Sequence, residues 1–195
     1  PHAWRNRGAL LIFASLSKAR GSGPIQVEHV NYIRAAVYKE FVGSLGLILG
    51  GPVIVTHNYG TRKGIANGTS ATLFDVQLTE EAVVRFLPLE GAAVGVHFVE
   101  AKEVRCLILK YKSKKWRTRT DFAPFLPKRC FPVITRSTSK QMDWGVSRRG
   151  KIFSVNMEQF WVLPRSASTG HKLQGQSEDF LVTAPWYSPW KFGNN

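Results

Sequence analysis

The middle of the chain is built from short runs rich in β-branched and aromatic residues. These runs are Val83–Leu87, Val94–Val99, Val104–Tyr111 and Trp116–Thr120. Only short turns separate them, and this spacing is typical of a small antiparallel barrel. Just upstream, Asn67 and Gly68 favour a hairpin because both tolerate positive φ, and the side chains that follow them alternate along the chain. The sequence therefore predicts β-structure over most of the stretch from residue 69 to residue 120.

The segments before residue 69 have a different pattern. Residues 9–16 form an apolar run that periodicity alone assigns to neither strand nor helix. Between residues 26 and 41 apolar side chains recur every three or four positions, which predicts an amphipathic helix. Leu45 to Asn58 is then predicted to be a strand entered through two glycines and Pro52. Because proline donates no ladder hydrogen bond, Pro52 is expected at the start or the edge of a sheet.

Positive charge is concentrated in one part of the chain. The 195 residues carry a formal net charge of +14, and residues 101–151 hold fifteen Lys or Arg against three Asp or Glu. Such a local excess favours a surface that faces a polyanion, although a solvated basic loop would give the same count. Within it, residues 110–119 interleave cations with Tyr111 and Trp116.

Polar side chains crowd between two apolar segments near the end of the chain. Residues 168–177 read Ser-Thr-Gly-His-Lys-Leu-Gln-Gly-Gln-Ser, with Gln159–Pro164 before them and Phe180–Ala184 after them. Both flanking segments have the composition of strands. In α/β nucleotide-binding proteins, a polar glycine-containing turn between two strands presents N–H groups to phosphates.

Two blocks of the sequence resemble one helicase family. Thr-x-His-Lys-x-Gln-Gly-Gln-Ser, over residues 169–177, is similar to the fifth conserved motif of superfamily-one DNA helicases of the petite-integration-frequency class, relatives of RecD and of Helitron helicases. Leu173 stands where that family usually has Ser. Residues 50–58 and 64–69 are similar to the family's Gly-x-Pro-Val-x-x-x-x-Asn and Gly-x-x-Asn-Gly-Thr patterns. With what lies between the blocks, the resemblance covers roughly residues 45 to 185.

The resemblance implies an α/β fold. It predicts part of the second RecA-like motor domain of a P-loop NTPase, with an inserted small antiparallel β-barrel that resembles a Src-homology-three fold. Residues 1–68 would belong to the motor domain and include the helix, residues 69–153 would form the barrel and a basic loop, and residues 154–195 would return to the motor domain.

The resemblance also assigns roles to individual residues. Thr169 would contact a DNA phosphate, and His171 with Gln174 would link the DNA track to the nucleotide cleft. Lys172 would be the cation nearest to phosphate, while Gly175 and Gln176 would lie on the nucleotide side. The alternative for this segment is a purely structural one, in which it is a capped helix start with an exposed His and Lys.

Two further nucleic-acid contacts are predicted with open alternatives. Asn58 could hydrogen-bond a base or sugar, or close a turn through its own side chain. Lys112, Lys115 and Arg117 could neutralise phosphates while Trp116 stacks on a base, a contact worth about 1–3 kcal/mol. The same lysines could instead protect a solvated strand edge from pairing with another chain.

No residue is predicted to be catalytic or to bind a metal. The chain contains no Gly-x-x-x-x-Gly-Lys-Ser/Thr phosphate loop and no Gly-x-Ser-x-Gly elbow, and its five histidines lack metal-ligand spacing. Phosphoryl transfer needs a loop lysine, a metal-binding acid and an arginine finger together. The chain alone is therefore not expected to hydrolyse ATP; ATP and Mg²⁺ are implied only for an intact protein, for which the resemblance implies helicase work in DNA repair and recombination.

The leading interpretation is the C-terminal, strand-gripping portion of an ATP-dependent DNA helicase. Its expected partners are single-stranded DNA or a duplex junction, together with the rest of the helicase chain. The alternatives are a stand-alone nucleic-acid-binding β-barrel and a degenerate, transposon-derived helicase remnant. Because the chain opens on Pro1 it is expected to be a piece of something longer.

The sequence also bears on the cellular setting. The longest apolar run, from Phe41 to Val55, is broken by glycines and predicts no membrane span. Two cysteines without metal spacing favour a reducing, intracellular compartment, nuclear or mitochondrial in a eukaryote.

Overall fold

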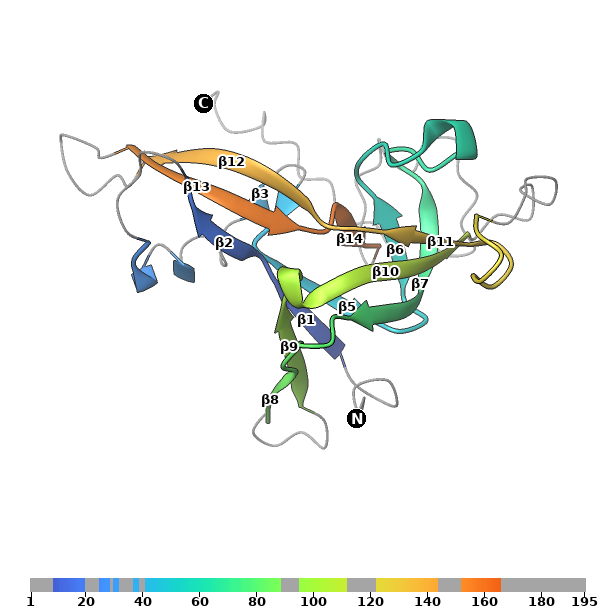
Figure 1. Cartoon of the computed structure of the whole chain (residues 1–195), viewed down its shortest axis with the longest axis horizontal. Coiled ribbons are helices and arrows are strands. Elements are labelled where there is room, and N and C mark those ends of the chain that lie inside the picture. The colour runs from blue at the N-terminus through green and yellow to red at the C-terminus, as the bar shows by residue number, and fades with distance from the viewer. Residues whose placement is uncertain are drawn as a thin grey trace, which may run out of the picture.

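The computed structural model describes residues 9–19, 25–28, 30–31, 37–38, 41–88, 95–111, 122–143 and 152–165. These residues form mainly β-strands, which belong to several sheets (Figure 1). The elements are β1 Ala9–Phe13, β2 Ser15–Lys18, β3 Val37–Tyr38, β4 Phe41–Val42, β5 Ser44–Ile48, β6 Pro52–Val55, the 3-10 turn η1 Thr61–Lys63, β7 Ser70–Leu78, β8 Arg85–Leu87, β9 Val96–Glu100, the 3-10 turn η2 Ala101–Glu103, β10 Val104–Tyr111, β11 Cys130–Val133, β12 Arg136–Asp143, β13 Ile152–Gln159 and β14 Val162–Pro164.

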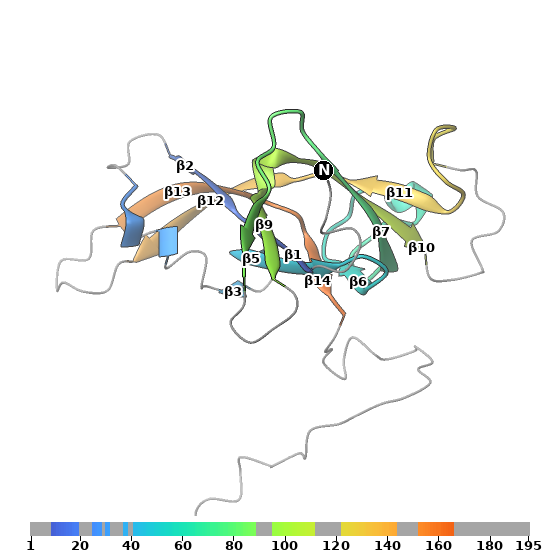
Figure 2. The same cartoon turned by 90° about the horizontal axis from the view of Figure 1, so that it is seen from below.

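Three of the sheets lie side by side along the long axis of the molecule. The three-stranded sheet β12-β13-β2 lies at one end, the four-stranded sheet β5-β1-β9-β8 in the middle and the five-stranded sheet β11-β10-β7-β6-β14 at the other end (Figures 1 and 2). β11 and β12 follow one another, so the chain passes from the five-stranded sheet to the three-stranded sheet between residues 133 and 136.

Within the five-stranded sheet the longest ladder joins β7 and β10. Leu73 pairs with Leu109 and Val76 with Leu107, and all four side chains are buried. A register shift between these pairs adds a bulge, which brings Val76 to the same face as Leu73 despite the odd spacing. The strict alternation predicted after Gly68 is therefore wrong in detail: Leu73 and Val76, which it places on opposite faces, are both buried, and Phe74, which it groups with Val76, is 45% exposed.

The apolar run at residues 9–16 is a pair of strands rather than a helix. Leu10 and Ile12 are buried, while the residues between them are partly exposed, which is the period of a strand. The run divides at Ala14, whose N–H donates to the Gly43 carbonyl at 2.8 Å. β1 then pairs antiparallel with β5 and parallel with β9, whereas β2 pairs with β13.

The helix predicted over residues 26–41 is wrong in its second half. Short helical turns are present only at residues 27–28 and 30–31 of the described part, and the exposed fraction of Val27 is 70%. Residues 37–38 and 41–42 instead form the antiparallel pair β3 and β4. Their β-branched and aromatic composition prefers a strand, and it outweighs a periodicity that fits a helix by coincidence.

The strand predicted over residues 45–58 is interrupted by a turn. β5 ends at Ile48, and the N–H of Gly51 donates to the Ile48 carbonyl at 2.9 Å. A Cβ added at Gly51 would lie 2.8 Å from that carbonyl oxygen, so only glycine fits this close approach. Pro52 is the first residue of β6, as predicted.

A single hydrophobic cluster joins all three predicted segments. Leu10, Leu73 and Val162 belong to it, although they come from residues 1–68, 69–153 and 154–195 respectively. Pairing also crosses these boundaries, because β6 pairs with β7 and β13 pairs with β2. The boundaries themselves, the RecA-like domain and the barrel insertion stay predictions.

Gln159 is a buried polar side chain at the end of β13. Its Nε2 donates to the carbonyls of Ile12 at 3.0 Å and Val42 at 3.3 Å, and its Oε1 accepts the N–H of Phe160 at 3.0 Å. The residue is 0% exposed. The carboxamide thus ties β1, β4 and the β13–β14 connection together.

Replacing this carboxamide by a hydrocarbon should destabilise the fold. Gln159→Leu leaves buried backbone groups without partners, and we expect a loss of about 2–3 kcal/mol in the free energy of unfolding, measured by urea denaturation. The matched variant Gln77→Leu removes an exposed amide from β7 and is expected to change stability by less than about 0.5 kcal/mol. Equal effects of the two variants would contradict the role given to Gln159.

Candidate nucleic-acid interface

Residues 56–69 form the loop between β6 and β7, which is called the η1 loop below. Backbone hydrogen bonds and a buried side chain hold this loop in place, and it carries exposed cations. Gly60 and Ile65 exchange two backbone hydrogen bonds of 2.9 Å each. The Ile65 side chain is 1% exposed and packs in the main hydrophobic cluster. This anchor leaves Arg62 and Lys63 exposed on the short turn η1.

Hydrogen bonds inside the η1 loop close it again before β7. The N–H of Asn67 donates to Oδ1 of Asn58 at 2.9 Å, and the N–H of Gly68 donates to the Val55 carbonyl at 2.8 Å. Gly68 has φ = 90°, in the left-handed region that favours glycine. Oγ1 of Thr69 accepts the N–H of Ala66 at 3.0 Å. The Asn-Gly-Thr pattern is therefore architectural here.

Asn58 uses its side chain to close the loop, one of the two roles predicted for it. Its Oδ1 is occupied by Asn67, and its exposed position leaves a DNA contact by the amide group as a prediction. Asn58→Ala should lower the free energy of unfolding by about 1 kcal/mol, while Asn58→Asp should retain the acceptor and most of the stability. Urea denaturation of both variants checks this, and equal losses would contradict it.

Lys63 connects the η1 loop to both ends of the basic segment at residues 112–121. Tyr111, just before that segment, donates its hydroxyl to the Lys63 carbonyl at 3.0 Å. Phe122 comes just after that segment, and its carbonyl accepts a hydrogen bond from Nζ of Lys63 at 3.5 Å. The same Nζ lies 4.1 Å from the centroid of the Phe122 ring. Tyr111 and Phe122, the two described residues that flank the basic segment, therefore both contact η1.

Arg129 forms two hydrogen bonds with the backbone of Tyr111. Its guanidinium donates to the Tyr111 carbonyl at 2.9 Å, and the N–H of Tyr111 donates to the Arg129 carbonyl at 3.0 Å. Arg129 has φ = 67°, which is uncommon for a residue with a side chain. The two hydrogen bonds offset the cost of this backbone conformation.

An aromatic cluster lies at the base of the η1 loop. The ring of His57 meets Tyr59 edge-on, with 5.9 Å between centroids, and Trp161 at 4.9 Å. The Tyr59 hydroxyl donates to the Ile134 carbonyl at 3.2 Å and accepts the N–H of Trp161 at 3.3 Å. Burial raises the pKa of the Tyr59 phenol, an effect that the Trp161 hydrogen bond and the charge of Arg136 oppose.

The strand of the first sequence block, β6, pairs with β14, which precedes the second block in the chain. Val55 pairs with Val162 and Val53 with Pro164. The N–H of Thr56 donates to the Trp161 carbonyl at 2.9 Å, and that of Arg165 to the Pro52 carbonyl at 2.9 Å. The first block is thus hydrogen-bonded along its whole strand to the strand that leads into the second block.

Most of the predicted contact residues lie outside the described residues. These are Lys112, Lys115, Trp116, Arg117, Thr169, His171, Lys172, Gln174, Gly175 and Gln176. Sequence reasoning missed the cluster of Tyr59, Arg136 and Trp161, since its members are far apart in the chain and follow no motif. The run of aromatic and cationic types around residues 57–63 was the one signal available for it.

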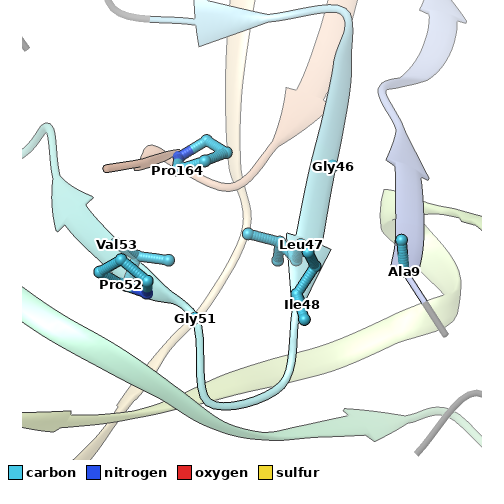
Figure 3. A pocket seen from close by; sticks show the side chains of 8 residues that line it. All are labelled: Ala9, Gly46, Leu47, Ile48, Gly51, Pro52, Val53 and Pro164. Carbon is cyan, nitrogen blue, oxygen red and sulfur yellow. The ribbon is translucent and has the colours of Figure 1, made fainter. Parts of the chain in front are cut away.

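A small apolar pocket lies at the other end of β6 (Figure 3). It has a volume of about 370 Å³ and is lined by Ala9, Gly46, Leu47, Ile48, Gly51, Pro52, Val53 and Pro164. Its lining side chains carry no charge and no hydrogen-bonding group, so the pocket offers no chemistry for catalysis or for holding phosphate.

The described residues contain no group of three or more His, Cys, Asp or Glu side chains able to hold a metal ion. They also include no phosphate loop, so they do not fit ATP with Mg²⁺. Cys106 and Cys130 are free and buried, and burial raises the pKa of both thiols. Within the same residues, no helix has the length and hydropathy to span a bilayer.

Comparisons with known proteins give only structural neighbours. No protein-family model matches the chain, and no curated protein matches it in sequence. The chain is similar to part of a Pif1 helicase from Candida albicans, with 13% identity and a TM-score of 0.44, over 88% of this chain and 32% of that one. Bacteroides Pif1 bound to ssDNA is 13% identical, with a TM-score of 0.43 over 89% of this chain and 28% of that one.

A third neighbour is Pif1 helicase from Bacteroides in complex with ADP-AlF3 and ssDNA, with 12% identity and a TM-score of 0.40 over 84% of this chain and 25% of that one. These neighbours are helicases. The chain spans about a third or less of their lengths. Similarity at these values establishes no activity.

Proposed function

We propose that the chain is the C-terminal portion of an ATP-dependent DNA helicase of the petite-integration-frequency type, and that it grips single-stranded DNA without hydrolysing ATP by itself. The pairing of β6 with β14 carries this proposal. The two blocks that resemble the family are about a hundred residues apart in sequence, yet β6 of the first block pairs with β14, which ends five residues before Thr169. Thr169 follows Arg165 by four residues, and a chain extends by at most about 3.6 Å per residue.

The η1 loop supports the gripping role. Arg62 and Lys63 are exposed on a turn that is anchored by Ile65, so little ordering is needed when they meet a phosphate. Tyr111 and Phe122, the described residues on either side of the basic segment, both contact Lys63. In the proposed mechanism these cations hold the strand's phosphates, while Thr169 and Lys172 contact the backbone and His171 with Gln174 relay the nucleotide state.

Removing the η1 cations should weaken binding in a salt-dependent way. For Arg62→Gln combined with Lys63→Gln, we expect the slope of log affinity against log salt to fall by about 1.4, because each lost phosphate contact on a single strand removes about 0.7. Fluorescence anisotropy of a labelled oligothymidine measures the slope.

The control for this experiment removes the same charge elsewhere. Lys102→Gln combined with Arg105→Gln takes two exposed cations from η2 and β10, one of which is ion-paired with Glu100. Its slope should stay near that of the unmodified chain. Equal losses in both pairs would point to net charge alone and would contradict a site at the η1 loop.

The second block is tested in the full-length protein. Thr169→Ala combined with Lys172→Ala is expected to lower single-strand affinity and DNA-stimulated ATP hydrolysis by roughly tenfold, since a hydroxyl and a cation on the strand are lost. Thr79→Ala combined with Lys18→Ala removes the same residue types from the position just after β7 and from the end of β2, and it should have little effect. Unchanged hydrolysis in the first variant would refute the strand-gripping role.

A stand-alone nucleic-acid-binding β-protein is the second candidate. It is favoured by the described residues being mainly strands and by the missing phosphate loop. This candidate requires strong binding by the 195-residue chain that does not change when Thr169 and Lys172 are replaced. Fluorescence anisotropy of the 195-residue chain carrying Thr169→Ala and Lys172→Ala therefore separates the two candidates.

A further inference from the structure

Arg136 is an exposed cation held by neutral rings. It is the first residue of β12, where the chain has just left the five-stranded sheet. Its Nη1 hydrogen-bonds Nε2 of His57, and its guanidinium carbon lies 5.7 Å from the ring centroid of Tyr59. Within the described residues its contacts include no carboxylate, whereas Arg85 forms an ion pair of 3.2 Å with Glu103.

The rings that hold Arg136 are themselves fixed. Tyr59 is tied to Ile134 and Trp161 by hydrogen bonds of 3.2 and 3.3 Å, and His57 packs edge-on against both Tyr59 and Trp161. Arginine is always a donor, so the ring nitrogen of His57 is the acceptor in this contact. The guanidinium is therefore oriented before any ligand arrives.

An oriented arginine without an acidic partner suits a phosphate. Its planar group has several N–H donors, and only part of them are used by His57. Orientation in advance reduces the entropy lost when the side chain binds a ligand. A carboxylate neighbour would compete with an anion, and the described contacts of Arg136 include none.

We propose that Arg136 binds a backbone phosphate of single-stranded nucleic acid, with His57 and Tyr59 as positioning residues. This inference rests on the proposed function and adds a specific residue to it. The η1 loop begins just before His57 and carries Arg62 and Lys63, so the strand would run from η1 toward the start of β12. Trp161 connects this contact to β14 and hence to the second block.

The test compares variants of the 195-residue chain binding a labelled oligothymidine between about 50 and 200 mM salt. Arg136→Gln should lower affinity about tenfold and lower the salt slope by about 0.7. Arg136→Lys should restore the slope but only part of the affinity, because an ammonium lacks the planar fork. His57→Phe keeps the ring contacts but removes the acceptor, so affinity should fall roughly two- to tenfold at unchanged slope.

Arg105→Gln is the matched control, since it removes one exposed arginine from β10. Thermal unfolding of each variant separates loss of fold from loss of contact, and the Arg136→Lys and His57→Phe variants carry the test if Arg136→Gln does not fold. If the unmodified chain binds and Arg136→Gln matches Arg105→Gln in affinity and slope, this inference is overturned and the proposed function stands. If the unmodified chain shows no salt-dependent binding, both are overturned.

Discussion

The carboxamide of Gln159 satisfies backbone groups of β1, β4 and Phe160 at the point where the chain turns from β13 toward β14. The three-stranded sheet and the five-stranded sheet are joined at this turn. A buried amide is costly unless its donors and acceptors are satisfied, and here the geometry of three separate segments satisfies them. Any displacement of β1 or β4 would break these bonds, so the relative placement of the sheets depends on this side chain.

The candidate interface depends on that placement. β14 begins just after Gln159 and lies along β6, and the η1 loop leaves from the end of β6. The aromatic cluster combines the rings of His57 and Tyr59, from the η1 loop, with the ring of Trp161, from the turn before β14. The buried amide of Gln159 is therefore connected to the exposed cations of the η1 loop through β14 and β6.

Local sequence patterns predicted the elements whose partners are close in sequence. The strand at residues 104–111 was predicted with its observed bounds, the alternation after Gly68 gave β7, and Pro52 was expected at a strand start. The two sequence blocks were recognised as motifs. The pairing of β6 with β14 was not foreseen, since pairing between distant strands leaves no mark in either strand alone.

The features that local patterns missed are set by distant contacts. The turn at Gly51 depends on the Ile48 carbonyl, and the pair β3 and β4 depends on side chains whose spacing also fits a helix. Arg136 could not be assigned to the candidate site from sequence because its partners, His57 and Tyr59, lie in a different sheet connection. Charge counts predicted a basic region but could not show which of its cations are oriented by neighbouring side chains.

The pairing of β2 with β13 and of β1 with β9 also has a consequence for folding. β1 and β2 are synthesised well before their partners β9 and β13, so their apolar faces and open edges stay unpaired until those later strands are made. Folding should therefore be slow for a chain of this size, and newly made protein should be prone to aggregate until β13 has been synthesised. A chaperone that shields β1 and β2 during synthesis would raise the yield of native protein.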